Sequence, residues 1–125
     1  MSKSSARSPD WPWPDSLDAP VAAPGSHRVL LENDRVRVVE VVVRPGEREP
    51  PHTHRWQSVM LIDRAARIRY YDALDHLAFE SPPRAEGETV AFLPPRVEWM
   101  APEGRHAVEN IDTVEYHAIR IELKP

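Results

Sequence analysis

Proline is the feature that most restricts the folds open to this chain. Fourteen of its 125 residues are proline, and they interrupt most of the windows that are long enough to form an α-helix. No window sustains apolar residues at the 3.6-residue spacing of an amphipathic helix. Short segments rich in Val, Leu and Ile lie between the turn-forming residues instead. The pattern therefore predicts an all-β fold of about nine short strands, arranged as a sandwich or a barrel.

The chain divides into a proline-rich N-terminal arm, residues 1–26, and a single barrel domain, residues 27–125. The arm is expected to be irregular. Its Trp11 and Trp13 leave two alternatives open: the arm docks on the barrel or a second subunit, or it is a disordered tail. The expected strands of the barrel are bounded by turn signals and span residues 28–31, 35–43, 58–62, 67–71, 76–80, 89–93, 97–101, 105–111 and 115–123.

Charge and composition exclude several classes of function. The net charge is −4 and the arginines are scattered, so no nucleic-acid-binding surface is expected. No apolar run approaches the roughly 18 residues that cross a bilayer, and the N-terminus lacks the apolar segment of a secretory signal. The absence of cysteine excludes disulfides and thiolate metal sites, and makes the cytoplasm the default compartment. Any metal must then be held by nitrogen and oxygen.

Two histidines stand one residue apart in the stretch PPHTHRWQS. In a strand, His52 and His54 point to the same face, about 6.5 Å apart, so their imidazoles can converge on one ion or small ligand if that face is enclosed. The alternative is a solvated pair in a loop. A third histidine, His106, follows a turn on a distant strand, where it is a further candidate ligand or else a capping or core residue.

The remaining histidines carry no motif. His27, His76 and His117 are expected at the surface or at a sheet edge. His117, on the last strand, is kept as a candidate to support the site from behind the ligands.

At these residues the chain resembles the cupin superfamily, in particular its small single-domain RmlC-like (cupin-2) members. The first cupin motif, G-x5-H-x-H-x3/4-E-x6-G, is matched in its front half, and the second, G-x5-P-x-G-x2-H-x3-N, is matched with one residue fewer before its histidine. The matching residues are Gly46, His52 and His54, then Pro102, Gly104, His106 and Asn110. The resemblance covers roughly residues 28–123 and implies a double-stranded β-helix, or jelly-roll, barrel.

The motif glutamate that many cupins use as a fourth ligand is missing, because Ser58 or Val59 stands at its place. The resemblance then implies a three-histidine centre of His52, His54 and His106 that holds one divalent ion, with Fe, Zn, Mn and Ni not distinguished. It also implies a homodimer, the common state of small cupins.

The function that follows from the resemblance is a metal-dependent enzyme acting on a small, anionic or carbonyl-bearing molecule. A dioxygenase, hence an oxidoreductase, is one reaction class, and an isomerase or a lyase is another. The alternative is a non-catalytic cupin that binds or senses a small molecule. No catalytic acid or base stands out in the sequence.

Strand alternation suggests which side chains line the pocket. Counting by twos from His54 places Trp56, Ser58, Met60 and Ile62 on the inner face. One of Trp99 and Met100, and one of Tyr70 and Tyr71, must also face inward. The pocket and supporting residues proposed on this basis are Trp56, Ser58, Met60, Trp99 and His117.

Overall fold

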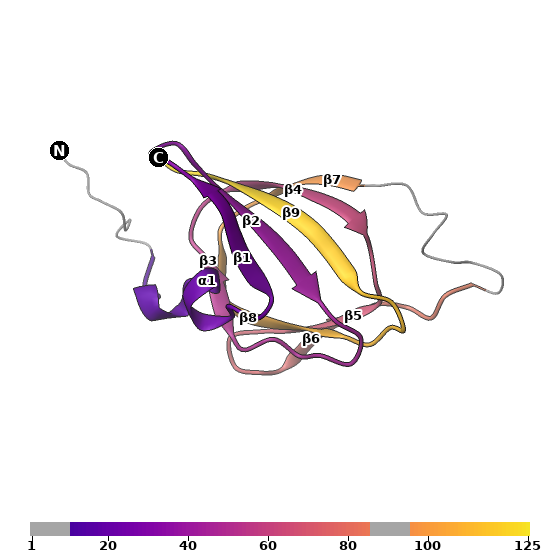
Figure 1. Ribbon diagram of the computed structural model, residues 1–125. Helices are drawn as coiled ribbons and strands as arrows, with labels where there is room; N and C mark the ends of the chain where they lie inside the picture. Colours follow the sequence, from indigo (N-terminus) through magenta and orange to yellow (C-terminus); the bar gives the residue numbers. More distant parts are fainter. Residues whose placement is uncertain (1–10, 86–95) are drawn as a thin grey trace.

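The computed structural model describes residues 11–85 and 96–125, and it is a barrel of two facing antiparallel sheets (Figure 1). Strands make up 52% of the described chain and helix only 7%, so the all-β prediction is confirmed. No helix in the described ranges has the length and apolar character needed to span a membrane.

Two short helical turns precede the barrel, η1 (Asp15–Leu17) and α1 (Ala19–Ala22). The strands that follow are β1 (His27–Glu32), β2 (Val36–Val43), β3 (His52–His54), β4 (Ser58–Arg64), β5 (Ile68–Tyr71), β6 (Leu77–Glu80), β7 (Arg96–Met100), β8 (Glu103–Asn110) and β9 (Tyr116–Leu123). The strand predicted at 89–93 lies outside the described residues.

Strand order brings distant parts of the chain together. The larger sheet has the order β1-β2-β9-β4-β7 and the smaller one the order β3-β8-β5-β6. Within the smaller sheet β3 pairs with β8, which places His52 directly opposite His106. Strands about fifty residues apart in sequence thus present their histidines to one end of the barrel interior.

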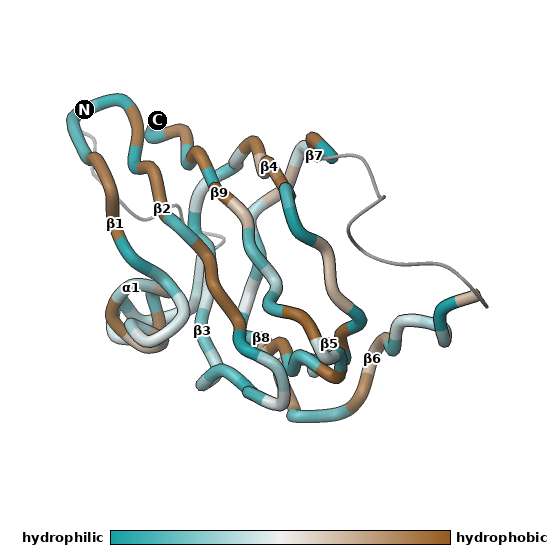
Figure 2. Tube along the Cα trace, turned by 45° about the vertical axis from the view of Figure 1, so that its right-hand side comes forward, coloured by the Kyte–Doolittle hydropathy of each residue, from teal (hydrophilic) through white to brown (hydrophobic). Residues whose placement is uncertain are grey.

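Alternation along the strands builds the apolar core. Along β2 every second residue is buried, including Val39, Val41 and Val43, and β4 contributes Met60 and Ile62 to the same cluster. Apolar and polar segments follow one another along β1 and β2 in Figure 2. The period of two is the one that a sheet with one buried face requires.

Polar side chains nevertheless outnumber apolar ones among the buried residues of the described ranges. They are Ser26, His27, Arg37, Glu49, His52, Thr53, His54, Ser58, His106, Asn110, Arg120 and Glu122. Burial of polar groups costs free energy unless each finds a partner. Such a concentration inside a small barrel therefore points to a site rather than to a second core.

The described part of the arm docks on the barrel. Ala19 and Ala23 are fully buried, and α1 lies beside β1 and β3 (Figure 1). Trp13 packs on Gly104 so closely that a Cβ at that glycine would lie 2.8 Å from the indole nitrogen. The arm was expected to be irregular; between residues 15 and 22 it forms η1 and α1, with Pro20 in the first turn of α1, a position that proline favours.

Side-chain to backbone hydrogen bonds hold the turns. Asn110 donates from Nδ2 to the carbonyls of Val43 and Val114 at 2.8 and 2.9 Å, and its Oδ1 accepts from the Asp112 amide at 2.8 Å. Asn110, the last residue of the second motif, thus fixes the turn between β8 and β9.

On the outer face of the larger sheet, a row of apolar side chains crosses all five strands. Cross-strand neighbours form one continuous row: Leu31, Val38, Ile121, Val59 and Trp99. A second row contains Ile119, Leu61 and Val97. Trp99 is 59% exposed and Val97 is 69% exposed. Contiguous exposed apolar surface of this kind is typical of an interface.

We propose that this face forms the expected homodimer, and we predict that the double variant Leu61→Glu/Trp99→Glu is a monomer. Two carboxylates on the face would have to be desolvated in the interface, which weakens association. Analytical ultracentrifugation at micromolar concentration measures the effect. Leu74→Glu, a 73% exposed position in the β5–β6 turn, is the matched control and should leave the dimer intact. A parent protein that sediments as a monomer contradicts the proposal.

Candidate metal centre

Backbone carbonyls fix the orientation of two histidines. The Nδ1 atom of His52 lies 2.9 Å from the Pro50 carbonyl oxygen, and that of His106 lies 2.7 Å from the Gly104 carbonyl oxygen. A carbonyl oxygen only accepts, so Nδ1 must carry the proton in both rings. Each Nε2 therefore presents a lone pair, which is the form that a metal ion binds.

His54 is supported by a carboxylate instead. Its Nδ1 lies 3.6 Å from Oε2 of Glu122, and both atoms are buried without a hydrogen-bond partner. Arg37 donates from Nε to the other oxygen of Glu122 and from both Nη atoms to Asp18 in the arm. Burial raises the pKa of Glu122, while the hydrogen bond from Arg37 opposes that rise. A carboxylate behind a histidine is a common support for a ligand.

His27 was expected at the surface or at a sheet edge. It lies on β1, the edge strand of the larger sheet, but the surface alternative is wrong. The side chain is in the pocket wall and the residue is 4% exposed. Its ring centroid lies 4.5 Å from that of His52 and 5.3 Å from that of His54. Sequence reasoning missed it because no motif marks the position. The docking of α1 beside the start of β1 encloses it.

The predicted ligands do meet in one place. The ring centroids of His52 and His54 are 5.1 Å apart, and the His106 ring lies 4.5 Å from His52 and 5.3 Å from His54. Two groups of three residues have ligand atoms within 4.8 Å of one another. The first group is His27, His52 and His54, and the second is His54, Glu103 and His106. Among the described residues none of the four Nε2 atoms makes a hydrogen bond.

Burial keeps these imidazoles neutral. It is the largest cause that lowers the pKa of His27, His52, His54 and His106 below the ordinary histidine value. Neutral imidazole is the form in which histidine binds Zn, Cu, Fe or Ni. The donor set therefore fits a divalent ion of this class.

Carboxylates that sequence reasoning did not name lie beside the histidines. Glu103 comes from the second motif, and its Oε2 lies 3.7 Å from Nε2 of His106. The same oxygen accepts from the Tyr70 hydroxyl at 3.2 Å, and Oε1 accepts from Nη2 of Arg120 at 2.9 Å. Its place between Pro102 and Gly104 was the signal available in the sequence.

Glu49 is the second such carboxylate. Its Oε1 lies 3.7 Å from Nε2 of His52, and its Oε2 accepts from the Ser26 hydroxyl at 2.7 Å. Burial raises the pKa of Glu49 to about 7. The residue lies within the spacer of the first motif, where the family pattern gives no reason to single it out.

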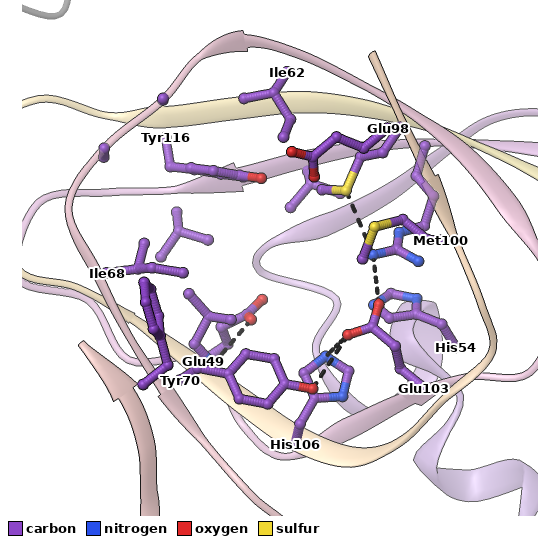
Figure 3. Close-up of a pocket in the computed structure, with 18 of the residues that line it drawn as sticks. Glu49, His54, Ile62, Ile68, Tyr70, Glu98, Met100, Glu103, His106 and Tyr116 are labelled. Carbon is purple, nitrogen blue, oxygen red and sulfur yellow. Dashed lines mark hydrogen bonds and ion pairs between the residues drawn. The ribbon is translucent and has the colours of Figure 1, made fainter. Parts of the chain in front are cut away.

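The histidines line a cavity of about 400 Å³ (Figure 3). Glu103, His106 and Tyr70 lie along one side of it, and Tyr116 and Ile62 face them from the other. The apolar wall includes Val41, Val43, Met60, Ile62, Ile68 and Met100, and the polar wall Glu49, Tyr70, Glu98, Glu103, Tyr116 and Arg120. Ser58 is fully buried and accepts from Nη1 of Arg120 at 3.0 Å. Ser58 and Met60 thus point inward, as the alternation predicts.

No family model and no curated protein matches the chain, but solved structures do. A cupin domain from Bordetella pertussis superposes with a TM-score of 0.60 at 18% identity, covering 79% of this chain and 92% of that one. An RmlC-like cupin with a double-stranded β-helix from Methanocaldococcus jannaschii superposes with a TM-score of 0.52 at 13% identity, covering 78% of each chain. The polyketide cyclase RemF from Streptomyces resistomycificus superposes with a TM-score of 0.51 at 16% identity, covering 82% of this chain and 67% of that one.

This chain has the cupin fold. At these identities the likeness is one of fold, and it agrees with the strand order and the paired motifs described above. In this barrel the buried Ser58 is at the place of the missing motif glutamate, while three carboxylates line the cavity from other positions: Glu49, Glu98 and Glu103.

Two tryptophans predicted to line the pocket lie elsewhere. Trp56 falls between β3 and β4, where the alternation breaks, and its ring lies under Arg37 at 4.9 Å and Lys124 at 5.4 Å. Trp99 pairs with Val59 on the outer face, so of Trp99 and Met100 it is Met100 that faces the cavity.

Of the two alternatives for His117, the structure agrees with the surface position and not with a role behind the ligands. His117 lies outside the barrel, where Nε2 is 2.8 Å from Oε2 of Glu40 and Nδ1 contacts Asp63. Alternation along β9 turns Ala118 and Arg120 inward and His117 outward. Hydrogen bonds to Asp63 and Glu40 raise its pKa. The residue therefore has no part in the centre.

We predict that Glu49→Gln stabilises the metal-free protein at alkaline pH. A carboxyl whose pKa is raised to about 7 on folding contributes full stability below its unfolded pKa and loses it as pH rises through 7. Glutamine stays neutral, so its advantage over the parent should grow by on the order of 2–3 kcal/mol between pH 4 and pH 8. Urea unfolding at several pH values measures this difference. Glu47→Gln, with a 37% exposed side chain, is the control, and an equal profile for both variants contradicts the prediction.

Proposed function

We propose that the protein is a metal-dependent enzyme that carries out acid–base chemistry on a small, anionic, carbonyl-bearing molecule. The observation that carries this proposal is the placement of Glu103 and Tyr70 beside the histidine cluster inside one cavity. A cavity with apolar walls alone favours an oxygenase or a binding module. The carboxylates and hydroxyls of this one favour an isomerase or lyase.

The centre is proposed to hold one divalent ion on His52, His54 and His106. Their rings are neighbours in space, their Nδ1 atoms face acceptors, and their Nε2 atoms are without hydrogen bonds in the described residues. A bound ion supplies polarisation of a carbonyl oxygen and a lowered pKa for a bound water.

Glu103 is the proposed proton acceptor. It lies at the edge of the histidine cluster, and it is held in place by the Tyr70 hydroxyl and by Arg120. The Tyr70 ring stacks on that of His106 at 5.1 Å, and burial together with Glu103 raises the pKa of its phenol. Tyr70 therefore stays protonated at neutral pH and acts as a hydrogen-bond donor to Glu103 or to a bound oxygen.

Arg120 supports the choice of an anionic molecule. Its side chain is 4% exposed and places a positive charge in the cavity wall. Its Nη atoms donate to Ser58 and Glu103, while its buried Nε has no partner. A cation held in an interior of low dielectric attracts an anion more strongly than it does in water. One solved structure with a similar fold is a polyketide cyclase, which supports an enzymatic role for this barrel.

The metal site is tested by substitution of each ligand. His52→Ala, His54→Ala and His106→Ala should each remove stoichiometric zinc, because each variant loses one of the nitrogens that hold the ion. Elemental analysis after gel filtration measures the stoichiometry, and circular dichroism checks that the barrel is folded. His76→Ala, in the exposed β5–β6 turn, is the control and should bind as the parent does. Full zinc content in His106→Ala would mean that the two motifs do not share a centre.

The reaction class is tested by proton exchange. In D2O, the zinc-loaded protein should speed the exchange of α-protons of α-keto and β-keto acids, followed by ¹H NMR. Glu103→Gln should reduce that rate by roughly a hundredfold or more, the usual contribution of a positioned base, with zinc content unchanged. Glu109→Gln is the matched control, because Glu109 accepts a hydrogen bond from Tyr71 rather than from Tyr70.

The alternatives give different results in the same panel. Oxygen uptake by the iron-loaded protein, with no proton exchange, points to the dioxygenase. Saturable binding of a keto acid with neither activity points to a non-catalytic binding or sensing cupin.

A further inference from the structure

His27 is a buried imidazole that the three-histidine pattern does not use. It begins β1 and pairs with Val41, whose side chain also lines the cavity. The four rings of His27, His52, His54 and His106 form one cluster in which neighbouring centroids are 4.5 to 5.3 Å apart. The ligand atom of His27 lies within 4.8 Å of those of His52 and His54.

The hydrogen bonds around His27 determine which nitrogen is free. Ser26 donates its hydroxyl proton to Oε2 of Glu49 at 2.7 Å, so the same hydroxyl oxygen accepts from Nδ1 of His27 at 2.9 Å. The Ala23 carbonyl, 3.3 Å away, is a second acceptor for that proton. Nδ1 therefore carries the hydrogen and Nε2 presents a lone pair, as in His52 and His106.

This lone pair has no acceptor role inside the protein. Nε2 of His27 makes no hydrogen bond within the described residues, although the residue is 4% exposed. His27 lines the cavity, so an ion bound there can reach this nitrogen. Burial, then the neighbouring His52, lowers the pKa of His27, so charge repulsion does not drive the ring out of the cluster.

We propose that His27 is a fourth nitrogen ligand of the metal centre, and that it compensates for the glutamate missing from the first motif. The inference rests on the proposed centre at His52, His54 and His106 and adds a ligand from β1, which the motifs do not include. An all-imidazole set selects borderline ions such as Zn, Co and Ni over Mg and Ca, which prefer oxygen.

The arm then belongs to the metal site. Ala23 and Ser26, which follow α1, hold the His27 ring. Asp18 at the start of α1 pairs with Arg37. Arg37 in turn contacts Glu122, the carboxylate behind His54. Docking of the arm and binding of the ion are therefore expected to stabilise each other, because only the docked arm presents His27.

X-ray absorption of the zinc-loaded full-length parent tests the proposal directly by counting imidazoles. Four are expected. Three imidazoles with one carboxylate oxygen would overturn the inference and assign the fourth position to Glu103 or Glu49. This measurement needs no substitution, so it decides the matter even if a variant fails to fold.

Substitution provides the second test. His27→Ala should weaken Co²⁺ binding at least tenfold and alter the visible absorption of the cobalt-loaded protein, because one nitrogen ligand is lost. Ser26→Ala should weaken binding less and leave four imidazoles, since it removes only the anchor. His76→Ala is again the control.

Failure of the fourth ligand is distinguishable from failure of the centre. If His27→Ala matches the parent in affinity and spectrum while His52→Ala and His54→Ala lose the ion, His27 is not a ligand and the three-histidine centre stands. If all of these variants keep the ion, the proposed centre itself is wrong.

Discussion

The buried pairing of Arg37 with Glu122 is the interaction on which the rest of the site depends. Arg37 points into the barrel from β2, contacts Glu122 on β9, and also binds Asp18 in the arm. Burial by itself lowers the pKa of Arg37, but the hydrogen bonds to Asp18 and Glu122 outweigh it and raise that pKa above the usual arginine value. Removing one partner of such a buried pair typically costs about 3–5 kcal/mol, because the other charge is left uncompensated. Here the loss would also release the arm and the carboxylate behind His54, and with them two of the four histidines.

The interior of the barrel is divided between an apolar core and a polar end. The core of Val39, Val41, Val43, Met60 and Ile62 supplies the hydrophobic free energy that a small barrel needs. Burial of the histidines and carboxylates at the polar end costs part of this free energy. Buried groups of this kind are kept at functional sites, where a water-poor cavity strengthens the interactions of charges with a ligand. The cavity opens between the two, so a molecule inside it has an apolar wall on one side and the proposed metal centre on the other.

Much of the fold could be read from the sequence. Prolines and the alternation in segments such as residues 35–43 excluded long helices and indicated short strands, and two spaced motifs indicated a cupin barrel. Within the site, the inward direction of Ser58, Met60 and Ile62 followed from counting by twos along an unbroken strand. The same rule failed for Trp56, because residues 55–57 lie between strands, where strand alternation does not determine the direction of a side chain.

The sequence by itself determined the periodicity, and with it the strands and the faces to which their residues point. It also contains the two motifs that bring His52 and His54 opposite the strand of His106. These features are local, since they depend on steric preferences and on the alternation of neighbouring residues along one strand. Only the tertiary structure decided the rest of the site. His27, Glu49 and Glu103 gain their positions from the docking of the arm and the pairing of β3 with β8, which join segments far apart in the chain. Burial then shifts the pKa of His27 and of Glu49, and burial is a property of the assembled barrel rather than of any stretch of sequence.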